Sequence, residues 1–544
     1  MQRRSRQLMG RIGRGTTGLL VLLVTLSLVS PVSALGVSSP VSPVSAMAAT
    51  AVPHVTGPLP VTADSYPFGA ADHTMVPQNL SRIGYVEEEY LVSGTANVYT
   101  WPAPGPAVVR TPNVPYTTRV LVRRPATRGR FSGNVVVEML NPSNLFDLNI
   151  GWAMMNRQIV ANGDAWVGIT AKPISVVALK NFNPTRYAAL SWANPLTLSD
   201  PANCALPTQA DSSRTTENGL VWDMYTQVGA WIRSNAPSNP FTYRRDRDRG
   251  RNDRDQGRGG DRQGGPVQHV YGFGYSQTGG FQYDYINAVQ PLVVQTDGKP
   301  MYDGYIVAVA GGAFAGLYRI NQCEPVPPVA DPRYQFKNVG VPIIHVMSQS
   351  DYLIGIASRR ADSDVFPDQF RHYEMAGAAH ATPDELYYAA APADIIKAGV
   401  TPPPLSCNEG PRSRFPSHIF FDAFLLNLER WVERGIAPPH ADPILVQNGA
   451  PVLDAFGNVT GGLRSPFLDV PTSTWFGSST GASFCFIAGH EVPFTEAQMH
   501  GLYPSHGAYV SAVAKDVRGL VRDRFITKSD GVSLVNAAAK ADAP

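Results

Sequence analysis

Apolar residues gather in short runs that recur between residues 117 and 375. Several of these runs are apolar at consecutive positions, which is typical of strands buried on both faces of a parallel sheet. The runs cover residues 117–122, 134–140, 165–170, 267–273, 304–309, 343–347 and 370–375. The pattern predicts a mostly parallel central sheet.

Two longer segments carry apolar residues at helical spacing instead. Residues 220–234 include Trp222, Tyr225 and Val228 on one face, and residues 418–434 form a longer segment of the same kind. Such amphipathic helices usually pack on a core and need not bind a ligand. Sheet and helices together predict an α/β fold in which helices flank the sheet.

The chain is best described as one large α/β unit with insertions, although the roughly 494 residues after the first 50 would allow about three domains of average size. We expect the core to span residues 56–440 and a C-terminal extension, residues 441–544, to pack on it. Residues 173–216 and 381–417 show neither strand nor clear helix pattern and are the expected cap or lid insertions. Within the core, residues 244–265 are rich in Arg, Asp and Gly without apolar residues, so we expect a disordered loop there.

The first residues of the chain have the pattern of an export signal. Five arginines precede an apolar stretch over residues 18–29, and small residues follow up to Ala34. The apolar stretch is shorter than the roughly 20 residues of a membrane span. We predict a signal peptide over residues 1–34, with cleavage as late as Ala49 as an alternative, then a disordered leader over residues 35–55. The protein would then be secreted, extracellular or periplasmic, without stable membrane association; an uncleaved anchor is the alternative.

Charge argues against a nucleic-acid partner. Residues 1–50 hold five arginines and no acidic residue, so the formal charge of +2 becomes −3 for the remainder. Nucleic-acid-binding domains usually carry a concentrated basic patch on a basic domain.

The four cysteines are widely spaced and form no CxxC pair, which argues against a zinc site. In an exported protein they predict two disulfides, and we favour Cys407 with Cys485 among the three possible pairings.

One motif carries candidate chemistry. Residues 274–280 read Gly-Tyr-Ser-Gln-Thr-Gly-Gly and lie between a predicted strand and a segment that can begin a helix. A serine on such a turn exposes its Oγ, and the next backbone N–H points to where an oxyanion would form. Ser276 is therefore the candidate nucleophile and Gln277 a candidate oxyanion donor. Thr278 departs from the usual pattern, which has glycine two residues after the serine.

Two downstream residues complete the order serine, acid, histidine. Asp351 follows the predicted strand 343–347, and His380 follows the predicted strand 370–375 in a turn of small residues. The imidazole would take the serine's proton and the carboxylate would orient the imidazole. Three other carboxylates are alternatives to Asp351, namely Asp362, Asp364 and Glu374. The second oxyanion donor is expected in the loop after strand 134–140, from Ser143 or Asn144, because Pro142 has no N–H.

These segments resemble the secreted α/β-hydrolase domain proteins of uncharacterised serine-esterase type, whose elbow reads GxSQ[ST]G. Residues 135–142, 359–364, 377–380, 463–471 and 501–504 are also similar, so the resemblance covers nearly all of the mature chain. It implies an α/β-hydrolase fold and hydrolysis of carboxylic esters, small or polymeric, with no metal or organic cofactor. In such relatives the residue two before Asp351 is often acidic, whereas this chain has Gln349.

The sequence leaves three functional hypotheses. The first is a secreted serine esterase that works through an acyl-enzyme on Ser276. The second keeps these residues but cleaves amides, peptides or lactones, because fold and nucleophile do not fix the leaving group. The third is a secreted binding protein of hydrolase-like fold that has lost catalysis, for which Thr278 is the best argument.

Overall fold

The computed structural model describes residues 50–205, 213–242, 267–311, 319–325, 327–328, 331–352, 356 and 359–542. The predicted signal peptide and the predicted loop over residues 244–265 lie outside these ranges. The predicted leader reaches residue 55, but His54–Thr56 pair with the neighbouring strand as β1. Because His54 is hydrogen-bonded into this sheet, the predicted leader can extend no further than residue 53.

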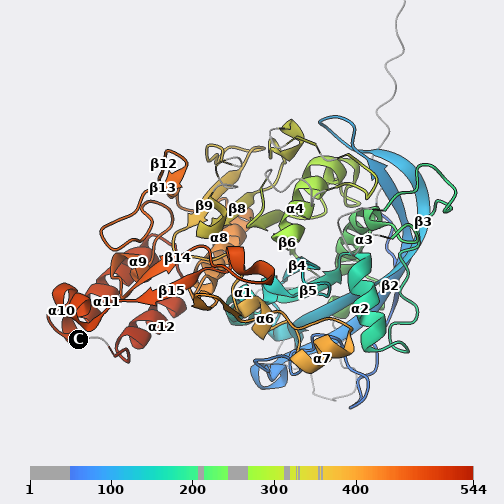
Figure 1. Ribbon diagram of the computed structural model, residues 1–544. Helices are drawn as coiled ribbons and strands as arrows, with labels where there is room; N and C mark the ends of the chain where they lie inside the picture. The colour runs from blue at the N-terminus through green and yellow to red at the C-terminus, as the bar shows by residue number, and fades with distance from the viewer. Residues whose placement is uncertain are drawn as a thin grey trace, which may run out of the picture. The chain divides into compact units, whose positions relative to one another are not determined.

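A nine-stranded sheet forms the centre of the chain (Figure 1). Its strands lie in the order β1-β2-β3-β5-β4-β6-β7-β8-β9. The strands β1 to β3 are antiparallel to their neighbours, and the pairs from β5 to β9 are all parallel. Their bounds are β2 Tyr85–Thr100, β3 Val108–Pro125, β4 Asn134–Leu140, β5 Ala165–Thr170, β6 His269–Tyr275, β7 Gly304–Ala308, β8 Ile343–Ser348 and β9 Phe370–Met375.

Helices cover both faces of this sheet. Neighbouring strand residues point to opposite faces, and β6 shows which helix lies on which side. The ring of Phe273 contacts Phe421 of α8, whereas a Cβ at Gly272 would meet the hydroxyl of Tyr225 on α3. The main helices are α1 Ile150–Asn162, α2 Pro173–Phe182, α3 Val221–Arg233, α4 Gln277–Asp284, α6 Asp384–Tyr387, α7 Pro392–Lys397 and α8 His418–Arg434.

The strands β5 to β9 are buried along their whole length, apart from the partly buried first residue of β6. This explains their continuous apolar runs, because a parallel sheet between two helical layers has no solvent-facing side. Since these strands are parallel, all their carboxyl ends lie at one edge of the sheet. Residues that follow β4, β6, β8 and β9 are thereby brought together.

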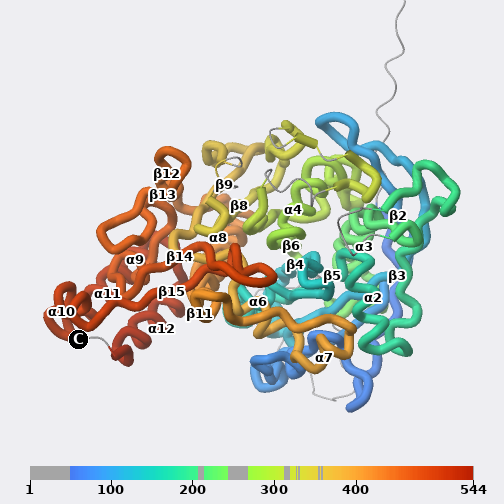
Figure 2. The backbone as a smooth tube through the Cα atoms, viewed as in Figure 1, coloured from blue at the N-terminus to red at the C-terminus, as the bar shows by residue number. Residues whose placement is uncertain are grey.

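The C-terminal region consists of short strands and helices. Its bounds are β10 Ser406–Cys407, β11 Gly410–Pro411, β12 Val446–Gln447, β13 Ala450–Pro451, α9 Pro466–Asp469, β14 Ser473–Phe476, β15 His490–Pro493, α10 Glu496–Leu502, α11 His506–Arg522 and α12 Lys528–Ala538. A short 3-10 segment with a kink at Phe484, η10 Ser483–Ile487, precedes β15. Figure 2 shows this late part of the chain beside the segment that contains α6. None of the helices in the described ranges is both long and apolar enough to cross a bilayer.

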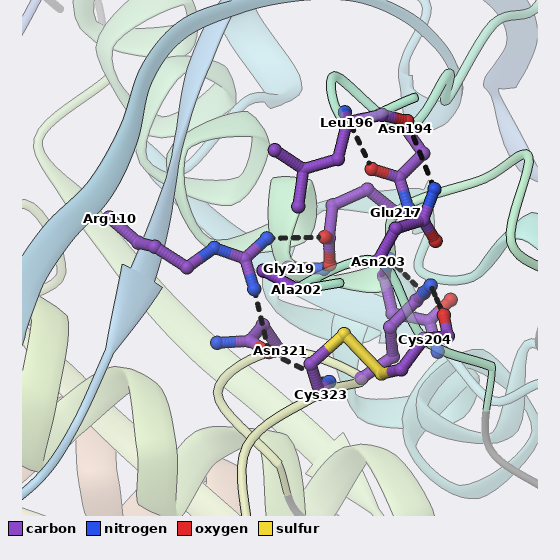
Figure 3. Close-up of polar contacts among 12 residues, drawn as sticks. Arg110, Asn194, Leu196, Ala202, Asn203, Cys204, Glu217, Gly219, Asn321 and Cys323 are labelled. Atoms are coloured by element: carbon purple, nitrogen blue, oxygen red, sulfur yellow. Dashed lines mark hydrogen bonds and ion pairs between the residues drawn. A yellow bond between two sulfur atoms is a disulfide. The ribbon is translucent and has the colours of Figure 1, made fainter. Parts of the chain in front are cut away.

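Two disulfides join distant parts of the chain. Cys407 pairs with Cys485, as expected, and Cys204 pairs with Cys323. The second bridge lies in a polar network in which Arg110 donates to the buried Glu217 and to Asn321 (Figure 3). Each bridge therefore fixes a loop that has little regular structure of its own.

Candidate active site

Ser276 occupies the sharp turn between β6 and α4. Its backbone has φ 55° and ψ −117°, a left-handed conformation that is costly for a residue with a side chain. The Ser276 N–H donates to Ala308 O of β7 at 2.9 Å, and its carbonyl accepts from Gly280 N–H at 3.0 Å. These two bonds hold the serine in the strained conformation. Its side chain is only partly buried and stands at the carboxyl edge of the sheet.

Glycines on either side of Ser276 permit this close turn. A Cβ at Gly274 would lie 2.2 Å from Thr278 O, and one at Gly279 would lie 2.5 Å from Ala308 O. Thr278 itself fits, because its Oγ1 donates to Tyr275 O at 3.1 Å and accepts from Tyr275 N–H at 3.2 Å. The glycine missing from position 278 is thus not needed there, since Gly279 makes the close approach to β7.

His380 lies in the turn after β9 and is held mainly through its backbone. Its N–H lies 3.0 Å from Ser350 Oγ and 3.1 Å from Ile487 O. Its carbonyl accepts from Tyr275 OH at 2.6 Å. Because the backbone is fixed from three directions, the imidazole has little freedom to leave its place beside Ser276.

The structure brings Ser276, His380 and Asp351 together in one hydrogen-bonded chain. His380 Nε2 lies 2.7 Å from Ser276 Oγ, and His380 Nδ1 lies 2.8 Å from Asp351 Oδ1. An ionised carboxylate only accepts hydrogen bonds, so Nδ1 carries the proton. In neutral imidazole Nε2 is then free to accept the serine hydroxyl. This is the geometry a serine nucleophile requires.

Asp351 is fixed by the turn that follows β8. Its Oδ2 accepts from Ser348 Oγ at 2.5 Å and from Ser348 N–H at 3.3 Å. Gln349 orients the neighbouring turn, because its Oε1 accepts Gly377 N–H at 2.8 Å and its Nε2 donates to Trp475 O at 3.2 Å. An amide at position 349 can both donate and accept, which an acidic residue cannot.

The alternative carboxylates are engaged elsewhere. Glu374 binds Arg359 and His372. Asp362 and Asp364 both pair with the buried Arg371. None of the three has a hydrogen bond to His380 among the described residues.

The electrostatics of His380 favour its charged form. Burial alone would lower the pKa of the imidazole, but the Asp351 carboxylate, by charge and hydrogen bond, and the charge of Glu385 more than offset burial. The net result is a pKa above the usual 6.5. A base of this strength can take a proton from a serine that attacks a carbonyl carbon.

The predicted oxyanion donors surround the serine, but one of them is already engaged. Ser143 N–H donates to Asn141 Oδ1 at 2.8 Å, because Asn-Pro-Ser closes a tight side-chain turn. Ser143 Oγ lies 3.3 Å from Gln277 Oε1. The backbone N–H groups of Gln277 and Asn144 have no hydrogen-bond partner in the described part of the chain. The N–H of Ser143 is thus already engaged, whereas those of Gln277 and Asn144 remain free to donate within the described part of the chain.

A small, open pocket with a cavity volume of about 20 Å³ is lined by Ser276 and His380. Its other polar lining comes from Asn141, Ser143, Asn144 and Glu385, and its apolar lining from Leu148, Ile150, Ala381, Phe484 and Ile487. Of the two segments expected to cover the site, the one beginning at Ala381 contributes to this lining. Tyr187, in the other, is instead buried and hydrogen-bonded to Glu89.

Several contributions to the pocket lining were not predicted from the sequence. Glu385 lies on α6 and has no motif around it, and Phe484 and Ile487 come from η10, far along the chain. The only available signal for η10 was the expected pairing of Cys407 with Cys485. In the described ranges, no group of three His, Cys, Asp or Glu side chains is arranged to hold a metal ion.

Comparison with known families agrees with this architecture. A family model described as an alpha/beta hydrolase domain matches residues 55–536. The chain belongs to this α/β-hydrolase family. The match covers most of the described chain, so the C-terminal helices of this α/β hydrolase fall within the family's domain. The expected fold class is confirmed.

Solved structures similar to this α/β hydrolase include several esterases. Acetyl xylan esterase 1 of a Thermoanaerobacterium species has 11% identity and a TM-score of 0.24, over 53% of this chain and 76% of that one. An esterase of Rhizomucor miehei has 9% identity and a TM-score of 0.29, over 61% and 83%. A glucuronoyl esterase of Solibacter usitatus has 7% identity and a TM-score of 0.26, over 54% and 77%. No curated protein matches the sequence.

Proposed function

We propose that this α/β hydrolase cleaves carboxylic esters through a catalytic triad of Ser276, His380 and Asp351. The observation that carries the proposal is the chain of two hydrogen bonds, 2.7 Å and 2.8 Å long, that joins the three side chains. Family membership and the strained serine turn support it. The geometry argues against the hypothesis of a binding protein without catalysis, because such a protein has no need for an oriented imidazole on a strained serine.

In the acylation step, Ser276 Oγ attacks the ester carbonyl carbon while its proton moves to His380 Nε2. The carbonyl oxygen becomes an oxyanion, which the N–H groups of Gln277 and Asn144 would bind. Asp351 accepts the Nδ1–H and stabilises the imidazolium. As the tetrahedral intermediate collapses, the C–O bond to the alcohol breaks and His380 returns its proton to the leaving oxygen.

In the deacylation step, water takes the place of the alcohol. His380 Nε2 removes a proton from the water as its oxygen attacks the acyl carbon. Collapse of the second intermediate breaks the bond to Ser276 Oγ, which regains the proton from His380, and the acid leaves. All proton transfers use one imidazole, so no metal or organic cofactor is required by this sequence of steps.

The Ser276→Ala variant tests the proposal with p-nitrophenyl acetate. We expect kcat to fall by roughly four orders of magnitude or more, because the nucleophile is lost. The free energy of unfolding should change by less than about 1 kcal/mol, since only one partly buried oxygen is removed. Ser533→Ala, on the exposed surface of α12, is the matched control. Retained turnover in Ser276→Ala would disprove the proposal.

We further propose that the enzyme acts outside the cytoplasm. Two disulfides support this, because such bonds persist mainly in oxidising compartments. The arginine-rich, then apolar, start of the sequence also fits. Sequencing the amino terminus of the protein recovered from culture medium or periplasm tests it: a start after Ala34, or as late as after Ala49, is expected, and an intact Met1 would contradict it.

A further inference from the structure

Glu385 brings a carboxylate into the pocket that the triad does not use. It lies on α6, shortly after His380, and lines the pocket together with Ser276 and His380. Its side chain is almost completely buried, with 5% of the residue exposed. Asp351 lies behind the imidazole and is not part of the described lining. Any molecule bound in the pocket therefore meets one carboxylate, that of Glu385.

Only one oxygen of Glu385 is held by the protein. Arg412 Nη1 lies 3.4 Å from Glu385 Oε1, a long and single contact. Arg412 is itself buried and does not line the pocket. Glu385 Oε2 has no hydrogen-bond partner among the described residues. This oxygen is not one of the fully buried atoms without a partner, so it is open to a donor on a bound substrate.

The position of Glu385 indicates which part of an ester it would meet. In the proposed mechanism His380 returns its proton to the leaving oxygen, so the alcohol part of the substrate lies on the histidine side. The carbonyl oxygen lies on the other side, toward Gln277 and Asn144. Glu385 lines the same pocket as His380, so a group on the alcohol part can reach its carboxylate.

The charges around this position also favour some substrates over others. Asp351, Glu385 and Asp384 bring negative charge to this position, and among the described residues Arg412 is the cation that acts on Glu385 while His380 is neutral. The pocket wall is then net negative, so a carboxylate on the alcohol part would be repelled, whereas a hydroxyl could donate to Oε2.

We propose that Glu385 is a specificity-determining residue that accepts a hydrogen bond from a hydroxyl on the alcohol part of the ester. The preferred substrates are then partial esters of diols and polyols, in which a free hydroxyl lies next to the ester bond. This inference rests on the proposed esterase function and narrows it to a class of substrate.

The titration of Glu385 is consistent with this role. Burial raises the pKa of the carboxyl, the charges of Arg412 and His380 lower it, Asp384 raises it again, and the pKa is about 7. Above this pH the group is a pure acceptor for a substrate hydroxyl. Below it the protonated carboxyl also donates, so discrimination for a hydroxyl should weaken.

Three acetates of matched alcohols test the inference at pH 8, with release of acetate as the readout. The alcohol part of 2-hydroxyethyl acetate offers a donor, that of 2-methoxyethyl acetate replaces it with an ether, and that of acetoxyacetate carries a carboxylate. We expect kcat/KM to be at least about tenfold higher for the hydroxyethyl ester than for the methoxyethyl ester, because a charge-assisted hydrogen bond is lost. Acetoxyacetate should be the poorest of the three.

The double variant Glu385→Met/Arg412→Met removes the acceptor without leaving a buried guanidinium unpaired. The hydroxyethyl-to-methoxyethyl ratio should fall to within about twofold of one. Because both substrates are measured in one preparation, the ratio does not depend on the fraction of folded protein. Glu496→Gln, at an exposed position on α10, should keep the wild-type ratio. An unchanged ratio in the double variant would overturn the inference.

Labelling of Ser276 by a fluorophosphonate separates the test of the Glu385 role from the test of the esterase function. If wild-type protein is labelled and hydrolyses p-nitrophenyl acetate but shows no preference among the matched acetates, the role of Glu385 is wrong and the esterase proposal stands. If it is neither labelled nor active, the proposed function is wrong and the inference falls with it.

Discussion

The backbone N–H of His380 donates to the carbonyl oxygen of Ile487 at 3.1 Å, and Ile487 lies in the C-terminal region of the chain. The next N–H, that of Ala381, donates to the same oxygen at 3.0 Å. Two residues before Ile487, Cys485 is bonded to Cys407. The late part of the chain thus supports the turn that carries the imidazole, and the disulfide ties that support in place.

Loss of this disulfide should therefore affect catalysis as well as stability. In Cys407→Ser/Cys485→Ser we expect unfolding to become easier by about 2–4 kcal/mol, because the unfolded chain is less constrained. We also expect kcat/KM for p-nitrophenyl acetate to fall about tenfold, since η10 no longer holds His380 firmly. Urea unfolding and steady-state kinetics measure the two effects.

The matched control is Cys204→Ser/Cys323→Ser, which removes the bridge shown in Figure 3. Its loss of stability should be similar, while kcat/KM stays within about twofold of wild type. Equal losses of activity in the two double variants would show that Cys407–Cys485 has no particular connection with the site.

Replacement of Asp351 by Asn should cost much of the catalysis while preserving the fold. The amide can donate toward Nδ1, which favours the wrong imidazole tautomer, and a loss in kcat of roughly four orders of magnitude is typical of this change. Asp364→Asn is the control, because Asp364 is one of the alternative acids and lies partly exposed beside Arg371. If Asp364→Asn is the inactive variant instead, the assignment of the acid is wrong.

The acid limb of the pH–rate profile reports the protonation of His380. The base must be neutral, and its pKa is raised above 6.5 by Asp351 and Glu385 against the effect of burial. Activity should therefore fall as pH drops through a midpoint above 6.5. In Glu385→Gln one negative charge is lost, so this midpoint should move to lower pH, as measured by kcat/KM from pH 5 to 9. A shift to higher pH would contradict this electrostatic account.

A pair of carboxyl groups joins α8 to the C-terminal helices. Burial, followed by the nearby charge of Asp530, raises the pKa of Asp422 to about 8, although Arg157 opposes the shift. A proton shared between Asp422 and Asp530 thus stabilises the folded state. Since the folded pKa lies above the unfolded value of 3.8, this stabilisation is complete below about pH 4 and is lost as pH rises through 8.

Asp422→Asn should remove this pH dependence, because an amide cannot ionise and still donates to Asp530. We expect the variant to be more stable than wild type at pH 9 by at least about 1 kcal/mol and close to wild type at pH 5. Urea unfolding at the two pH values tests this. A variant that is destabilised equally at both would show that the shared proton is unimportant.

The parallel strands were predictable because burial on both faces leaves an uninterrupted apolar signature. Strands β4, β5 and β9 and helix α8 begin and end where the sequence predicts. Strand β2 was missed, since it carries Glu87, Glu88 and Glu89 in succession. These acids are acceptable in a strand because Arg123, Arg124 and Arg119 of β3 pair with them across the antiparallel ladder. Such pairing depends on tertiary contacts that no local pattern reveals.

For the site, the order of Ser276, Asp351 and His380 was readable because each residue directly follows a parallel strand. The residues that hold this triad in place could not be predicted in the same way. Ser350, Tyr275 and Ile487 act on His380 through single hydrogen bonds, and these contacts depend on how distant loops pack. The binding of Ser143 N–H by Asn141 is by contrast a local turn of Asn-Pro-Ser, which the sequence could have indicated.

The most direct test of the central claim is mass spectrometry of the protein after reaction with a fluorophosphonate. A single adduct on Ser276 in the wild type, with labelling slowed by at least about a hundredfold in His380→Ala, is the result that the hydrogen-bonded triad predicts. Absence of an adduct on Ser276 in folded wild-type protein, or equally fast labelling without the imidazole, would contradict it.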